Sequence, residues 1–172
     1  NVIKEMEQKV LENYSIRVWE DAAKSVTHLI DDLLVNSGNT ELVLYPGHDF
    51  STQVGIHVGS LLKSTGRGGY LMYGPHRSLK PGSYTVQVFD IPTQRTAGNL
   101  AIDFVGNGGT KCFWQGVFAI SEADDDIEKL LFEFQLCIDV EVNDFEIRCV
   151  VGEANLTLSR VFIKEEIVEF NA

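Results

Sequence analysis

The spacing of apolar residues changes near residue 38, from a helical period to a period of two. An apolar face recurs at steps of three and four residues before that point. Its members are Trp19, Ala22, Val26, Leu29 and Leu33. Ser15 is a good N-cap for this helix, and residues 36–39 are typical of a helix end. We therefore expect a helical linker or packing segment over residues 1–38, with its apolar face packed on the rest of the chain or on a second chain.

From residue 39 onward, apolar and polar residues alternate in short runs separated by turn-forming residues. The expected strands cover residues 41–45, 52–58, 69–73, 83–90, 98–105, 111–120, 129–140, 144–151 and 155–164. No long helix interleaves them, which argues against a parallel α/β sheet. We predict a mainly-β domain over residues 39–172: an antiparallel β-sandwich, specifically a jelly roll, with a bulge near Arg160.

The charge balance limits the classes of partner. Fourteen Lys and Arg residues stand against 25 Asp and Glu residues, a net charge of −11, so nucleic acid and anionic lipid are disfavoured partners. No apolar run approaches the ~20 residues of a membrane span. The first residues show no signal peptide and no initiator Met. We therefore expect a fragment of a longer cytoplasmic protein, without a membrane span.

Three cysteines, Cys112, Cys137 and Cys149, lie inside apolar, strand-like runs. Their spacing fits neither a zinc site nor a paired disulfide framework. We predict buried, reduced thiols, which is typical of cytosolic proteins.

Catalytic and metal-binding motifs do not occur in recognisable form. The sequence has no nucleophile elbow, no zinc-protease helix and no phosphate-binding loop, and its four histidines lack ligand spacing. We therefore predict no catalytic residue, no metal and no cofactor. The acidic run 124–126 leaves two interpretations open, a calcium-binding loop or a solvated acidic turn.

A basic and aromatic segment is the strongest functional signal. Residues 51–89 contain no acidic side chain but include Tyr70, Tyr73, His76 and Arg77. Aromatic rings cover the apolar face of a sugar ring, and Arg or His side chains bind its hydroxyls. These four residues are therefore candidate glycan-binding residues. The alternative is that the tyrosines belong to the core and the charges keep the loops soluble.

Trp114 is the fifth candidate, because it alternates with Gly116 along one expected strand. A large ring beside a missing side chain forms either a flat shelf for a sugar or a core contact above the glycine.

Several stretches carry a resemblance to a known class of domain. They are residues 50–55, 69–76, 79–86 and 98–103, with the tail segments 132–134, 145–148 and 156–158. Together they resemble β-sandwich accessory domains attached to bacterial glycosyltransferases that build cell-surface polysaccharides such as O-antigen. Residues 14–23 are similar to the terminal helix that closes the catalytic domain of such transferases.

The resemblance implies a non-catalytic carbohydrate-binding module that retains or positions a growing glycan. It also implies an upstream catalytic glycosyltransferase domain as partner, an oligosaccharide or polysaccharide as ligand, and a place in the cytoplasm or at the inner face of the membrane through the parent protein. The alternative is a structural sandwich that packs on the catalytic domain or self-associates through residues 1–35.

Overall fold

The computed structural model describes residues 41–166, and the predicted helical segment over residues 1–38 lies outside that range. The described part contains eleven strands and one short helix. They are β1 (Glu41–Leu44), α2 (Pro46–Asp49), β2 (Gly55–Val58), β3 (Leu61–Ser64), β4 (Gly69–Met72), β5 (Pro75–Leu79), β6 (Gly82–Asp90), β7 (Gly98–Gly106), β8 (Lys111–Ile120), β9 (Lys129–Ile138), β10 (Val142–Val151) and β11 (Thr157–Glu165). None of the helices among these residues is long and apolar enough to span a membrane.

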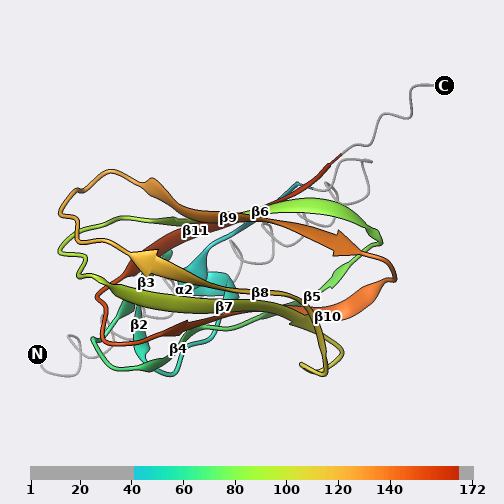
Figure 1. The fold of residues 1–172 in the computed structure, drawn as a ribbon, viewed down its shortest axis with the longest axis horizontal. Coiled ribbons are helices and arrows are strands. Elements are labelled where there is room, and N and C mark those ends of the chain that lie inside the picture. Colours follow the sequence, from blue (N-terminus) through green and yellow to red (C-terminus); the bar gives the residue numbers. More distant parts are fainter. Residues whose placement is uncertain (1–40, 167–172) are drawn as a thin grey trace, which may run out of the picture. The chain divides into compact units, whose positions relative to one another are not determined.

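Two antiparallel sheets lie face to face, as Figure 1 shows, and the predicted β-sandwich is confirmed. The six-stranded sheet has the order β2-β3-β11-β6-β9, with β1 also paired to β11. The five-stranded sheet has the order β4-β10-β7-β8, with β5 also paired to β10. Early strands thus pair with late ones in a nested series, which is the pattern that a jelly roll requires.

The core fills the space between the sheets with the inward half of each alternating strand. In β7, Leu100, Ile102 and Phe104 are almost fully buried, and Phe104 stacks on Phe145 of β10 with ring centroids 5.2 Å apart. The register of β11 shifts between Leu158 and Arg160, so the predicted bulge occurs at that place. The buried residues of β7 thus alternate with less buried ones, as expected for a strand with one face in the core.

Two strands were missed by the sequence analysis. β3 forms a hairpin with β2 across Gly59 and Ser60, and Gly59 has the positive φ of 59° that this tight turn needs. β5 contains His76 and Arg77, which lie between the expected strands 69–73 and 83–90; the expectation of no strand there was wrong. β5 tolerates Pro75 at its first position because it pairs only with β10, so no second ladder needs the missing N–H.

The burial predicted for two cysteines is also wrong. Cys149 is fully buried, but Cys112 and Cys137 are exposed. Cys137 lies between the buried Leu136 and Ile138, so its side chain has the outward phase of β9. In a strand with one buried face, every second side chain points toward solvent even when the run is apolar, and Cys137 occupies such a position.

Candidate functional site

The outer face of the five-stranded sheet carries two neighbouring rows of side chains. The first, called the apolar row below, crosses β4, β10, β7 and β8 and consists of Tyr70, Val150, Ala101 and Val117. The second, called the polar row, lies two residues along each strand and consists of Arg148, Asp103 and Gln115. Side chains two residues apart on a strand share one face of the sheet, so both rows face outward together.

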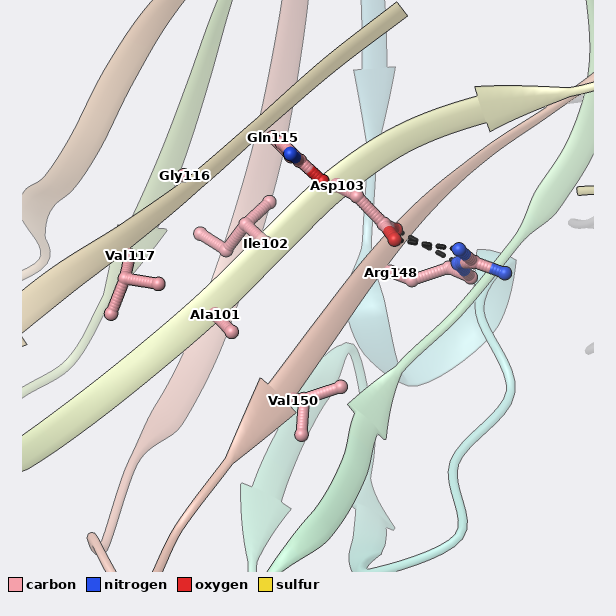
Figure 2. Close-up of a pocket in the computed structure, with 8 residues that line it drawn as sticks. All are labelled: Ala101, Ile102, Asp103, Gln115, Gly116, Val117, Arg148 and Val150. Carbon is pink, nitrogen blue, oxygen red and sulfur yellow. Dashed lines mark hydrogen bonds and ion pairs between the residues drawn. The ribbon is translucent and has the colours of Figure 1, made fainter. Parts of the chain in front are cut away.

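Three members of the apolar row (Ala101, Val117 and Val150) and all three of the polar row line a hollow of about 420 Å³, and Figure 2 draws its lining residues as sticks. A second hollow of about 470 Å³ shares Ala101, Val117 and Val150 with it and continues toward Asn99 and Glu153. We call the two hollows together the groove. The small side chain of Ala101 lies between two valines, and this low centre in the apolar row deepens the sheet face into a groove.

A bidentate ion pair between Arg148 and Asp103 holds these two side chains of the polar row in place. Arg148 donates from Nε to Asp103 Oδ1 at 2.8 Å and from Nη2 to Asp103 Oδ2 at 2.6 Å. These hydrogen bonds raise the pKa of Arg148 further, against the opposing effect of burial. Each side chain stays about one-quarter exposed, at 26% for Arg148 and 28% for Asp103. The pair is therefore rigid but still accessible from the groove.

Gln115 completes the polar row from the edge strand β8. Figure 2 shows its amide directed along the row toward Asp103, across β8 and β7. The three side chains present planar groups that offer hydrogen-bond donors and acceptors side by side. Such a row suits a ligand with several neighbouring hydroxyls.

Trp114 faces the inside of the sandwich. Its ring stacks on Phe134 of the opposite sheet, with centroids 4.0 Å apart and an interplanar angle of 16°. A Cβ atom added at Gly116 would lie only 2.5 Å from Cη2 of Trp114. The missing side chain at Gly116 therefore makes room for the ring from within, and these contacts favour the core interpretation of Trp114.

The two tyrosine candidates lie together at one end of the apolar row. Their rings are 6.3 Å apart in an edge-to-face arrangement. Tyr70 is directly opposite Val150 in the sheet. Tyr70 therefore extends the apolar row beyond Val150, but neither tyrosine is among the residues that line the two hollows.

His76 and Arg77 lie on β5, with different surroundings. His76 is exposed, with Nδ1 at 3.7 Å from Glu146 Oε1. Arg77 donates from Nη2 to Asp49 Oδ1 at 3.2 Å, which ties β5 to α2. The ion pair with Asp49 therefore gives Arg77 a role in holding β5 against α2.

The sequence analysis missed Arg148 and Gln115 as site residues. Asp103 stood only as the last residue of the segment 98–103, which contributes to the resemblance. The sequence offered one signal for this pair: Asp103 and Arg148 carry opposite charges at outward positions of two otherwise apolar strands. Those strands are 45 residues apart at the Asp103–Arg148 contact, so only the fold joins them.

The acidic run 124–126 uses its carboxylates within the protein. Asp124 accepts a hydrogen bond from the Gln94 N–H, and Asp126 accepts one from the Thr93 hydroxyl. Asp125 forms an ion pair with Lys129. Within residues 41–166, no group of three metal-ligating side chains converges. The run thus fastens the loop after β6 to the loop before β9.

No protein-family model and no curated protein matches the chain. The C-terminal CBM6 of LamC from Zobellia galactanivorans has 11% identity and a TM-score of 0.51, over 73% of this chain and 99% of that one. A carbohydrate-binding module of Cellvibrio mixtus lichenase 5A, solved with cellotriose, has 12% identity and a TM-score of 0.49, over 73% and 98%. The VP2 subviral particle of infectious bursal disease virus has 11% identity and a TM-score of 0.46, over 76% and 33%. The LamC likeness shows a shared β-sandwich fold, and at this identity it shows the fold alone.

Proposed function

We propose that residues 41–166 form a non-catalytic module that binds a carbohydrate chain in the groove. The observation that carries the proposal is the pairing of the apolar row with the polar row on one hollowed sheet face. A sugar ring has an apolar C–H face and a rim of hydroxyls, so it fits both rows at once.

The chemistry of the rows supports this assignment. Val117 is 71% exposed, and a sugar ring lying on it would cover apolar surface that now faces water. Gln115 and the Asp103–Arg148 pair would exchange hydrogen bonds with the hydroxyls. Millimolar affinity for one sugar, about −4 kcal/mol, requires only a few such contacts, and a longer chain along the groove adds more.

The first hollow of the groove also favours binding over hydrolysis. Glycoside hydrolysis needs two carboxyl groups on either side of the scissile bond. Among the residues that line the first hollow, Asp103 is the single carboxylate, and Arg148 holds both of its oxygens. The module would therefore retain a glycan without changing it.

The similarity to accessory domains of bacterial glycosyltransferases suggests a setting for this module. Attached to such a cytoplasmic enzyme, the groove would hold the growing polysaccharide near the catalytic site. The benefit would be a higher effective concentration of the chain end.

The test is binding of the purified chain to a panel of neutral and acidic polysaccharides by affinity gel electrophoresis. We expect retardation by at least one polysaccharide, and Ala101→Tyr should weaken it at least tenfold because the new ring fills the low centre of the groove. The matched control is Gln135→Tyr, at an exposed position of the other sheet, which should bind like the parent. Absence of binding across the panel would support the structural alternative, and equal binding by both variants would place the site elsewhere.

A further inference from the structure

The ion pair in the groove has a consequence for the class of sugar. Asp103 occupies Nε and Nη2 of Arg148, which are the atoms that would otherwise grip a carboxylate with two hydrogen bonds. The carboxylate of Asp103 therefore already neutralises the positive charge of Arg148 within the site. Gln115, the third member of the polar row, carries no charge.

The atoms that stay available suit hydroxyl groups. Each oxygen of Asp103 accepts one hydrogen bond from Arg148 and keeps lone-pair capacity for another. The guanidinium keeps Nη1 and the second hydrogen of Nη2 outside this pair. A neutral diol can donate to Asp103 and accept from Arg148, whereas a carboxylate can only accept.

Neighbouring acidic groups act in the same direction. Glu153 lines the second hollow, and Glu146 lies two residues from Arg148 on the same outward face of β10. The whole chain carries a net charge of −11. The field at the groove therefore repels an anionic chain.

Resting on the function proposed above, we infer that the groove takes neutral, hydroxyl-rich sugars, and that Asp103 excludes uronic acids by neutralising Arg148. Asp103 is then the residue that sets specificity. Removal of its charge would free Arg148 to bind a uronate carboxylate.

The test uses pairs of polysaccharides that differ only at C6. Polyglucuronate, polygalacturonate and polymannuronate are each compared with their carboxyl-reduced products, a glucan, a galactan and a mannan. The parent chain should bind the neutral member of any retained pair at least tenfold more tightly than the acidic member. Asp103→Asn should reverse this preference for the same pair, with tighter binding of the acidic member at low salt.

Asp139→Asn is the matched control, because it makes the same change in net charge at an exposed carboxylate paired with Lys111. It should leave the parent's preference intact. The double variant Asp103→Asn/Arg148→Gln removes both charges but keeps a polar side chain at each position, and it should bind both members of a pair with similar affinity. This second variant keeps the test decisive if Asp103→Asn alone folds poorly.

The outcomes separate the two proposals. If the parent binds no neutral or acidic glycan of the panel, both the proposed function and this inference are wrong. If the parent binds glycans in the groove but prefers the acidic members, only the inference is wrong. If Asp103→Asn and Asp139→Asn change the preference equally, the net charge of the chain and not Asp103 determines the preference between neutral and acidic glycans. The inference is then wrong as well.

Discussion

Replacement of Arg95 by methionine should destabilise the sandwich strongly, because it leaves a buried carboxylate without its partner. Asp90, at the end of β6, is fully buried, and Arg95 donates from Nη1 to both of its oxygens at 3.1 and 2.9 Å. Arg95 also donates from Nε to the Ser121 carbonyl at 3.0 Å. Methionine keeps a similar apolar stem but none of these hydrogen bonds.

The expected loss is about 3–5 kcal/mol at pH 7, the usual range when one partner of a buried pair is removed. Burial already raises the pKa of Asp90, and hydrogen bonds from Arg95 oppose that rise. Without Arg95 the pKa rises further. Between the unfolded pKa and this raised folded pKa the native state binds more protons, so stability falls as pH rises. The loss should therefore be larger at pH 7 than at about pH 4.

Urea unfolding of parent and variant at both pH values measures this difference. Lys111→Met is the control, since its partner Asp139 is exposed, and its unfolding midpoint should stay close to that of the parent. Asp90→Asn/Arg95→Met should recover stability relative to Arg95→Met, because the buried charge is gone. A loss below about 1 kcal/mol at pH 7, or an equal loss at both pH values, would refute the reasoning.

Three further outcomes can be measured on the same protein. Gly116→Ala should cost about 1–3 kcal/mol in urea unfolding, because its Cβ would lie 2.5 Å from the packed Trp114 ring; a neutral change would contradict this packing. Burial raises the pKa of Tyr84 to about 12, so the parent should lose stability between pH 10 and 12, and Tyr84→Phe should show a weaker dependence on pH there. Iodoacetamide should label two thiols of the native chain, and Cys149 only after unfolding, because burial removes access and raises the pKa of its thiol; three labels on the native chain would contradict its burial.

Long alternating strands were predictable, whereas two of the short strands, β3 and β5, were not. In β9, Phe132, Phe134, Leu136 and Ile138 repeat at a period of two and are all buried, so the pattern identifies both the strand and its buried face there. β3 has only four residues and β5 begins with a proline, so neither shows a period that exceeds chance. These two strands exist because β11 and β10 supply a partner edge, which is information from the fold and not from the local sequence.

The candidate site was partly predictable for a related reason. The tyrosines at 70 and 73 share a short segment, so their proximity follows from the local sequence. The contact between Asp103 and Arg148 depends on β7 lying beside β10 in one register, and a shift by one residue would separate their faces. The local sequence indicated Tyr70 and Tyr73 as candidates. Asp103 and Arg148 become neighbours only through the pairing of β7 with β10.

The contrast between the two outer faces explains why the groove lies on the five-stranded sheet. On the six-stranded sheet, polar side chains pair with one another by hydrogen bonds: Gln87 donates to Glu133 at 2.6 Å, and Gln135 donates to Thr85 at 2.8 Å. On the five-stranded sheet, Ala101 lowers the middle of the apolar row while the ion pair beside it stays about one-quarter exposed. A small residue beside fixed, accessible polar groups is what makes a sheet face able to bind a ligand, and this pattern occurs where the two rows meet.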